Sequence, residues 1–450
     1  MAKFNIVNPY NNKILQEKHY HSLELAYKKV VDLDSAYRIW HNNSFQDRAN
    51  LIQAFRDFLE LSKHDLAKLI TSDMGKPIIE SESELDKSIE CCDFYIANIA
   101  LISKRMNLEY GIREPIGVVM GIMPWNYPLW QVIRFLIPTL IIGNTCLIKP
   151  AFNTYRITEF INKFFQRQNI QVVDALIIED SDVEKIIECQ NISAVSLTGS
   201  IKAGRRVGGI VGKNLKPCIL ELGGSDPYIV FSDSDIDMAI TSAMRSRFLN
   251  SGQTCIAAKR FYFQQDIFSK SLELFVAKAN KYLKYGDPYD RDTTLGPMAR
   301  RDIKLGLEDQ IKRANINSSQ ILYKGPAISG DGNYFAPMII DASELDNENP
   351  LLKEEVFGPV AVCMPFEDYD DVIMKANQTE FGLGASIWTQ DPIIQKQVIS
   401  DIDSGIVAIN SMVKSDPAQP FGGRKNSGIG IELGIDGAMS FTNYKTIITG

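Results

Sequence analysis

The chain has 450 residues, of which 45% are hydrophobic and 23% charged, and it carries a net charge of −7. This length predicts two or three domains, and the negative charge argues against a nucleic-acid partner. The most apolar stretch, residues 135–148, is interrupted by Pro138, Gly143 and Asn144, and the first residues lack the apolar run of a signal peptide. We therefore expect neither a membrane span nor a secretory signal.

Amphipathic helices are predicted for residues 23–103, because apolar side chains recur three and four positions apart. They cover residues 22–40, 46–63 and a third segment that runs through Cys91. From residue 115 onward the pattern changes, and strands alternate with helices. The expected strands are 116–123, 145–149, 172–178, 194–199 and 218–222, and the expected helices begin near residues 128, 158, 182 and 201.

A second alternating series begins near residue 227. Its expected strands are 227–231, 259–263, 360–366 and 405–410, and its expected helices are 235–249 and 267–285. Such alternation predicts parallel sheets covered by helices on both faces, which is an α/β fold. Residues 441–449 resemble a strand without a partner nearby in the sequence, so we expect another sheet or another subunit to pair with it.

The seven cysteines form no CxxC pair and no Cys/His cluster of the kind that binds a metal. We expect reduced thiols in a cytoplasmic protein. All four histidines lie in the first 64 residues, far in sequence from Cys255 in the segment NSGQTCIAA. A metal site and a Cys–His dyad are therefore disfavoured, and Cys255 is a buried, inert thiol unless other residues activate it.

Two glycine-containing turns follow predicted strands. In LTGSIKAG, Gly199, Ser200 and Gly204 open a helix, where backbone N–H groups approach a phosphate or simply form a strand-to-helix turn. In LELGGSDP, Glu221 ends an apolar strand ahead of two glycines. Its carboxylate is either desolvated or held in a helix cap or an ion pair. Neither motif decides the function alone.

Two further motifs have both an ordinary and a functional interpretation. In MPWNYP, Asn126 lies between Trp125 and Tyr127 and is either a turn-former or a hydrogen-bond donor to an oxyanion. In EEVFGPV, Glu355 and Phe357 precede a Gly-Pro turn, a setting that ordinary loops share. Only the combination of all these motifs in one chain is informative.

Together the motifs resemble the aldehyde dehydrogenase superfamily, in which they occur in this order along one α/β chain. The resemblance rests on Asn126, Lys149, Gly199, Glu221, Cys255 and Glu355, and extends to PFGGRKNSG and the final strand. It implies a Rossmann-like cofactor-binding domain (1–97 and 115–222), an α/β catalytic domain (223–437) and a small β oligomerisation element (98–114 and 438–450). A homodimer and a homotetramer are both compatible with it.

The resemblance also assigns catalytic roles. Cys255 would attack the aldehyde carbonyl, the Asn126 amide and the Cys255 N–H would stabilise the oxyanion, and hydride transfer to the nicotinamide would leave a thioester. Glu221 would then activate the water that releases the acid. The presence of Glu221 argues against a relative that transfers the acyl group to coenzyme A. The intact set of three residues argues against a non-catalytic binding protein on the same fold, and no metal is implied.

The implied cofactor is NAD(P)+. Its contacts would come from Trp125, Lys149, Gly199, Ser200, Gly204, Glu355 and Phe357. Many NAD-preferring relatives carry a glutamate three residues after the lysine, where it repels a 2′-phosphate. This chain has Phe152 there. We therefore expect NADP to be tolerated, and a preference for NAD does not follow.

Within the superfamily, the segments around Cys255 and residues 411–423 most resemble the short bacterial succinate-semialdehyde dehydrogenases. That substrate ends in a carboxylate, and the resemblance implies Arg134 as the residue that binds it. The alternative for Arg134 is an ion pair on a helix surface. Arg247 is expected to be a second arginine contact and Ser415 a hydroxyl contact. A broad-range dehydrogenase of uncharged aldehydes would share every catalytic residue and is the main rival.

Overall fold

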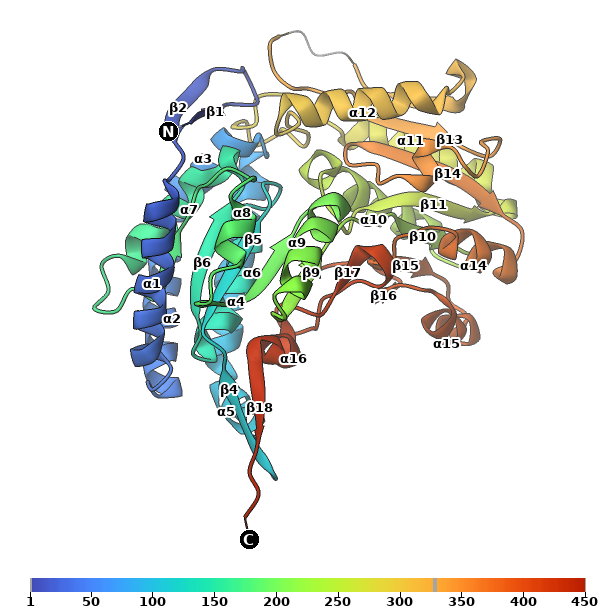
Figure 1. The fold of residues 1–450 in the computed structure, drawn as a ribbon. Helices are drawn as coiled ribbons and strands as arrows, with labels where there is room; N and C mark the ends of the chain where they lie inside the picture. Colours follow the sequence, from blue (N-terminus) through green and yellow to red (C-terminus); the bar gives the residue numbers. More distant parts are fainter. Residues whose placement is uncertain (1, 327–329, 450) are drawn as a thin grey trace.

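The structure is a computed structural model that describes residues 2–326 and 330–449 (Figure 1). Within these ranges the chain forms a six-stranded sheet, a seven-stranded sheet and two small antiparallel sheets of two and three strands. We call the six-stranded sheet (β17-β9-β8-β5-β6-β7) sheet I and the seven-stranded sheet (β12-β13-β14-β11-β10-β15-β16) sheet II. Both are mainly parallel and packed with helices, which confirms the predicted α/β class.

The N-terminal part is helical, as predicted, but it begins with a hairpin that no sequence pattern indicated. The hairpin pairs β1 (Lys3–Val7) with β2 (Ile14–His19). The helices are α1 (Leu23–Trp40), α2 (Phe45–Leu61), α3 (Lys63–Met74), α4 (Ile78–Ala97) and α5 (Ile99–Met106). Ser22 and Ser44 cap α1 and α2 with side-chain oxygens that accept backbone N–H groups, which explains where both helices start.

Sheet I contains β5 (Val118–Met123), β6 (Thr145–Pro150), β7 (Val173–Ala175), β8 (Ile192–Thr198), β9 (Cys218–Glu221) and β17 (Gly428–Ile429). Its helices are α6 (Trp130–Ile141), α7 (Tyr155–Phe165), α8 (Val183–Ile187) and α9 (Ile201–Lys213). Residues of β5 alternate between its faces: Val118 and Met120 pack with α1, α8 and α9, whereas Val119 and Met123 pack with α2, α4 and α6. Each face therefore has its own core.

Sheet II contains β10 (Asp226–Val230), β11 (Ala258–Gln264), β12 (Ile321–Lys324), β13 (Met338–Asp341), β14 (Val360–Phe366), β15 (Gly384–Trp388) and β16 (Ile406–Ile409). Its helices are α10 (Ile236–Phe248), α11 (Phe268–Tyr282), α12 (Arg301–Ala314), α13 (Pro350–Lys353), α14 (Tyr369–Asn377) and α15 (Pro392–Asp401). The chain then returns through β17, which pairs with β9 of sheet I, and the short helix α16 (Gly434–Ala438).

The final strand, β18 (Thr442–Thr446), pairs antiparallel with β4 (Gly111–Pro115), which also pairs with β3 (Asn107–Leu108). The partner that the sequence left unidentified is thus a strand of the same chain. Figure 1 shows β18 and β4 extending away from the two main sheets towards the C-terminus. Within the described ranges, no helix is both long enough and apolar enough to cross a membrane.

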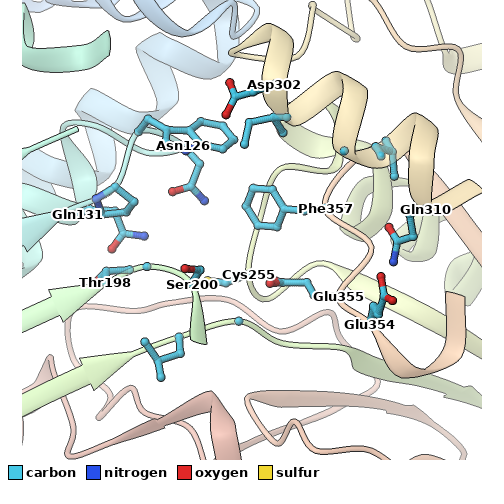
Figure 2. A pocket seen from close by; sticks show the side chains of 18 of the residues that line it. Asn126, Gln131, Thr198, Ser200, Cys255, Asp302, Gln310, Glu354, Glu355 and Phe357 are labelled. Carbon is cyan, nitrogen blue, oxygen red and sulfur yellow. The ribbon is translucent and has the colours of Figure 1, made fainter. Parts of the chain in front are cut away.

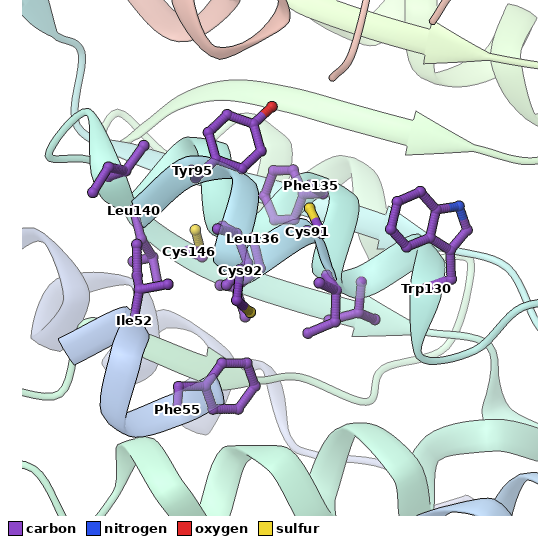
Figure 3. Close-up of a cluster of buried hydrophobic side chains, with 14 of the residues drawn as sticks. Ile52, Phe55, Cys91, Cys92, Tyr95, Trp130, Phe135, Leu136, Leu140 and Cys146 are labelled. Atoms are coloured by element: carbon purple, nitrogen blue, oxygen red, sulfur yellow. The ribbon is translucent and has the colours of Figure 1, made fainter. Parts of the chain in front are cut away.

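Three cysteines other than Cys255 pack in the core between α2, α4 and α6 (Figure 3). Cys91 and Cys92 of α4 and Cys146 of β6 are fully buried among apolar side chains. Burial raises the pKa of each of these three thiols above its ordinary value. A thiol that resists ionisation in an apolar core is a packing group rather than a nucleophile.

Candidate active site

The segment that carries Cys255 turns sharply between α10 and β11. Asn250, Ser251 and Gly252 lie in the left-handed region, with φ of 55°, 52° and 73°. A serine in this conformation is uncommon, and its side chain is held by a 2.8 Å hydrogen bond to the carbonyl of Gly296. Strained backbone of this kind persists where surrounding contacts enforce it, and it is common at functional sites.

Arg247 is one of the residues that enforce this turn. Its guanidinium is fully buried and donates to the carbonyls of Ala258 (3.0 Å) and Gly252 (2.8 Å), and also to the Gly358 carbonyl. It lines neither of the cavities that reach Cys255. The substrate contact predicted for Arg247 is therefore wrong, because backbone carbonyls already take up this guanidinium.

Cys255 lies where two cavities meet. One cavity has a volume of about 410 Å³ and is lined by Asn126, Ser200, Glu355 and Phe357 (Figure 2). The other has a volume of about 540 Å³ and runs between α4, α6 and the segment after β16. Cys255 contributes to both walls. A group bound in either cavity therefore reaches the same thiol.

Burial raises the pKa of the Cys255 thiol to about 11, while Arg134 and Lys259 act in the opposite direction. The thiol is therefore protonated in the resting protein at neutral pH. Asn126 lies close to the same turn, since its Nδ2 donates to the carbonyl of Gln253 at 2.9 Å. An amide nitrogen carries two protons, so one remains for a bound oxygen atom.

Glu221 ends β9 and is 2% exposed. Neither carboxylate oxygen forms a hydrogen bond to any described residue. Burial raises the pKa of Glu221 well above its usual range, Arg134 opposes the shift and Glu432 adds to it. The charge of Glu221 also raises the pKa of Cys255. Once ionised, a carboxyl group with a raised proton affinity is a stronger base than an ordinary carboxylate, which suits Glu221 to accept a proton.

The first cavity has the features that a dinucleotide requires. Ser200 caps α9, and the first turn of that helix contains no acidic residue, so its N–H groups and positive dipole end suit a diphosphate. Trp125 and Phe357 form an edge-to-face aromatic pair in the wall. Glu355 is held by a 3.1 Å hydrogen bond from the Gly224 N–H and by Lys259 at 3.4 Å. These residues fit NAD(P)+.

Three predicted cofactor residues do not line that cavity. A Cβ at Gly204 would lie 2.5 Å from the side chain of Leu222, so this glycine lets α9 approach β9. Lys149 is the last residue but one of β6 and lies 3.0 Å from an oxygen of exposed Asp180. Phe152 follows β6, and the guanidinium of Arg300 covers its ring, 5.2 Å from the centroid. Lys149 and Phe152 are near the end of β6 and are not among the residues that line the cavity.

The second cavity contains two of the predicted substrate residues. Arg134 is 1% exposed, and its Nε lies 2.7 Å from a carboxylate oxygen of Glu432. Ser415 accepts hydrogen bonds from Lys87 Nζ at 2.6 Å and from Trp130 Nε1 at 3.1 Å. Arg134 thus lines the cavity, as expected, but its charge is already balanced by a buried carboxylate.

Sequence reasoning missed two lysines of this site. Lys87 lines the second cavity from α4, and Lys259 is fully buried and donates to the carbonyl of Thr254 at 3.1 Å and to that of Cys255 at 2.5 Å. Lys87 lies in a helix with many charged residues, where a lysine usually faces solvent. The position of Lys259, four residues after Cys255, was the sequence signal that could have identified it as part of the site.

Comparison with known proteins agrees with the geometry. The profile of the aldehyde dehydrogenase family matches residues 1–447. A succinate semialdehyde dehydrogenase (NAD(P)+) of Escherichia coli K12 is 37% identical over 92% of this chain and 90% of its own. A succinate-semialdehyde dehydrogenase (NADP(+)) of Mycobacterium ulcerans is 38% identical over 94% of this chain and 93% of its own.

A solved structure of succinic semialdehyde dehydrogenase from Streptococcus pyogenes, in complex with NADP+, is similar over the same length. It has a TM-score of 0.93 and 30% identity, with 99% of both chains covered. The sequence profile and the shared fold both extend over nearly the whole chain. The protein belongs to the aldehyde dehydrogenase family.

Proposed function

We propose that this protein oxidises succinate semialdehyde to succinate, with NAD(P)+ as the oxidant. The observation that carries the proposal is the position of Cys255 at the meeting point of two cavities, one fitted to a dinucleotide and the other lined by Lys87, Arg134 and Ser415. An aldehyde at Cys255 then has the oxidant on one side and, on the other, a wall that contains Lys87 and Arg134 together with carboxylates such as Glu84. The names of the relatives from E. coli and M. ulcerans support the same substrate.

Cys255 supplies the nucleophile. Its thiol first gives up its proton to water, the Sγ thiolate then bonds to the aldehyde carbon, and the electron pair of the C=O bond moves to the oxygen, which becomes an oxyanion. The free Nδ2 proton of Asn126 and the Cys255 N–H stabilise that charge. When bound, NAD(P)+ supplies the acceptor for the hydride that leaves this carbon. Trp125, Gly199, Ser200, Glu355 and Phe357 would hold it, and the product of this half-reaction is a thioester on Cys255.

Glu221 acts in the second half-reaction as the general base. The water oxygen bonds to the thioester carbon, one water proton passes to the Glu221 carboxylate, and the carbon–sulfur bond breaks. Cys255 leaves as thiolate and the acid is released. Glu221 lines neither cavity, but it has no hydrogen-bond partner among the described residues and its charge acts on Cys255, which supports this role.

The choice between NAD+ and NADP+ depends on the end of β6. Phe152 carries no charge, so it does not repel a 2′-phosphate, and the guanidinium of Arg300 lies over its ring. A cation near this position favours a phosphate. We therefore infer that both cofactors are accepted. The relative from S. pyogenes was solved with NADP+.

We also infer three domains with the boundaries expected from the sequence: cofactor-binding (1–97 and 115–222), catalytic (223–437) and oligomerisation (98–114 and 438–450). The division is supported by β9 of sheet I ending at Glu221 and β10 of sheet II beginning at Asp226. Exposed Tyr444, Ile447 and Ile448 support a homodimer or a homotetramer. Free cysteines in the described chain support a cytoplasmic location.

Initial rates of reduced-cofactor formation with succinate semialdehyde and with butanal test the proposed function. These aldehydes have similar chain lengths and differ in the distal carboxylate. We expect kcat/KM for succinate semialdehyde to exceed that for butanal about tenfold or more, since a buried charge contact discriminates at least this strongly. Equal or higher kcat/KM for butanal would instead support a broad-range dehydrogenase, a reading that the apolar lining by Tyr127, Ile256 and Phe421 favours.

A further inference from the structure

Lys259 contacts the backbone on both sides of the reacting cysteine, but it lines neither cavity. Its side chain is fully buried near the start of β11, and its ammonium has three acceptors. These are the carbonyl oxygens of Thr254 (3.1 Å) and Cys255 (2.5 Å) and the Oε1 atom of Glu355 (3.4 Å). An ammonium carries three protons, so these acceptors occupy all of them and leave none for a substrate or a cofactor.

The carbonyl of Thr254 belongs to the same peptide group as the N–H of Cys255. In this trans peptide bond the oxygen and the N–H point in opposite directions. The oxygen is held by two donors, Lys259 Nζ at 3.1 Å and the N–H of Ala257 at 3.2 Å. Fixing the oxygen therefore also fixes the direction of the Cys255 N–H, to which no backbone carbonyl in the described ranges is bound.

The second carbonyl that Lys259 binds belongs to the peptide group after the thiol. One ammonium thus holds the peptide groups on both sides of the Cys255 Cα, which restricts rotation there and fixes the direction of the Cβ–Sγ bond. Bonds from a charged donor are stronger than bonds between neutral groups. A cation at a carbonyl oxygen also polarises the peptide group, so the N–H on its other side becomes a better donor.

Lys259 also has a purely structural interpretation, as a counter-ion. Burial lowers the pKa of Lys259, and the carboxylates of Glu355 and Asp226 oppose this shift. A counter-ion would stabilise the fold without acting on the reaction. It would not need to bind two successive carbonyls of the segment that carries the nucleophile, which is the feature that favours a role in the reaction.

We propose that Lys259 is a positioning residue, which directs the Cys255 N–H towards the oxyanion that forms when the thiolate attacks the substrate. The proposal rests on the proposed function, because it requires an oxyanion at Cys255. Lys259 contacts neither the aldehyde nor the cofactor and acts through the carbonyl of Thr254. Through Glu355, which lines the first cavity, the same ammonium links the nucleophile to the wall of the cofactor site.

Two reagents that modify Cys255 without a cofactor separate this role from the acidity of the thiol. The thiolate attacks the carbonyl carbon of 4-nitrophenyl acetate, an oxyanion forms, and 4-nitrophenolate leaves as the thioester is made. The thiolate attacks the CH2 carbon of iodoacetamide, and iodide leaves without an oxyanion. Both reactions need the thiolate. The ratio of their rate constants at one pH is therefore independent of the thiolate fraction and reports the stabilisation of the oxyanion.

The acylation rate constant is taken from the first turnover of 4-nitrophenolate release, and Cys255→Ala gives the background. The alkylation rate constant is taken from mass spectrometry of the peptide that contains Cys255. Burial raises the pKa of Cys255, and Arg134 and Lys259 oppose that shift. Loss of the Lys259 charge should therefore slow both reactions by the same factor, and only the loss of orientation should change their ratio.

In Lys259→Met, which removes both the donor and the charge, we expect the ratio of acylation to alkylation to fall about tenfold. Removal of an oxyanion donor costs about 10²–10³-fold, and here the donor stays but loses its support. Lys259→Gln keeps two N–H groups without the charge, and its ratio should fall about threefold.

Two further variants give the reference values. Asn126→Ala removes the other oxyanion donor, and its ratio should fall about a hundredfold. Lys29→Met is the matched control, because Lys29 is also largely buried and pairs with Asp174 of sheet I at 2.7 Å, outside both cavities. Its ratio should equal that of the unmodified protein.

An unchanged ratio in Lys259→Met, with a lowered ratio in Asn126→Ala, would overturn the inference and leave the proposed function intact. An unchanged ratio in Asn126→Ala would show that the oxyanion site is wrong, and the inference would fail with that part of the proposed function. An equal fall in Lys29→Met and Lys259→Met would show that Lys259 only supports the fold. If Lys259→Met does not fold, an unchanged ratio in Lys259→Gln contradicts the inference.

Discussion

At the scale of single residues, burial sets the chemistry of the site. It raises the pKa values of Cys255 and Glu221 and lowers that of Lys87, so each group differs from its behaviour in water. Arg134 is close enough to lower the pKa of both Cys255 and Glu221. Arg134, which pairs with Glu432, therefore favours the ionised forms of Cys255 and Glu221. This effect does not depend on which aldehyde is bound.

Arg134→Met should consequently affect both substrates. It leaves Glu432 in the interior without its cation, which should lower the free energy of unfolding by about 3–5 kcal/mol. We expect kcat/KM for succinate semialdehyde and for butanal to fall together. Urea unfolding and the two rate constants check this result. The double variant Arg134→Met/Glu432→Gln should recover most of the stability, because no unpaired charge remains. Unchanged stability with a loss confined to succinate semialdehyde would show that Arg134 itself binds the carboxylate.

At the scale of elements, the site is built from segments that follow strands. Gly199 and Ser200 follow β8, Glu221 ends β9, and Asn126 follows β5. In a parallel sheet the carboxyl ends of the strands share one edge, which is where such folds bind ligands. Cys255 approaches this edge from the other sheet, on the turn that precedes β11. Its position therefore depends on how the two sheets pack.

Phe152→Glu tests how the residue that follows β6 affects the choice between NAD+ and NADP+. The new carboxylate should repel a 2′-phosphate by about 1–3 kcal/mol, which corresponds to a shift of about ten- to a hundredfold towards NAD+. Quenching of tryptophan fluorescence gives the dissociation constants of both cofactors, and Phe152→Gln is the uncharged control. Because Arg300 would partly pair with the new glutamate, Phe152→Glu/Arg300→Met should show a larger shift. An unmodified protein that does not bind NADP+ would refute this account of Phe152.

The sequence predicted most helices and strands because apolar periodicity is a local property. The motifs at strand ends were also recognisable, since turn residues and their neighbours are contiguous in the chain. The roles of the charged residues were not recognisable from the sequence, because Arg247 and Lys87 both occur in amphipathic helices. Only the packed structure shows that the Arg247 guanidinium binds backbone carbonyls while Lys87 faces a cavity. The β1–β2 hairpin was missed, since its alternation of apolar and polar residues is short.

At the scale of the whole molecule, the three-stranded sheet of β3, β4 and β18 stands apart from sheets I and II (Figure 1). In the described chain β18 pairs with β4 alone, so its other edge has unpaired N–H and C=O groups. Such an edge readily pairs with another chain. Exposed Ile447 and Ile448 add an apolar surface that assembly would cover.

Deletion of residues 442–450 should therefore abolish assembly. Light scattering of the eluting protein should give the mass of a dimer or tetramer for the full chain and of one chain for the deleted variant. Circular dichroism provides the control that the two main sheets still fold. A full chain that elutes as a monomer, or a deleted variant with the mass of the full assembly, would show that this sheet does not hold subunits together.

The central claim is that Cys255 carries the acyl group of succinate semialdehyde until Glu221 activates water. Glu221→Gln tests it most directly, because the thioester should form but not hydrolyse. The variant is mixed with succinate semialdehyde and NADP+, quenched in acid, digested and examined by mass spectrometry. We predict one reduced cofactor per active site and one succinyl group on the peptide that contains Cys255. A peptide without the succinyl group, or a succinyl group on a different cysteine, would contradict the account.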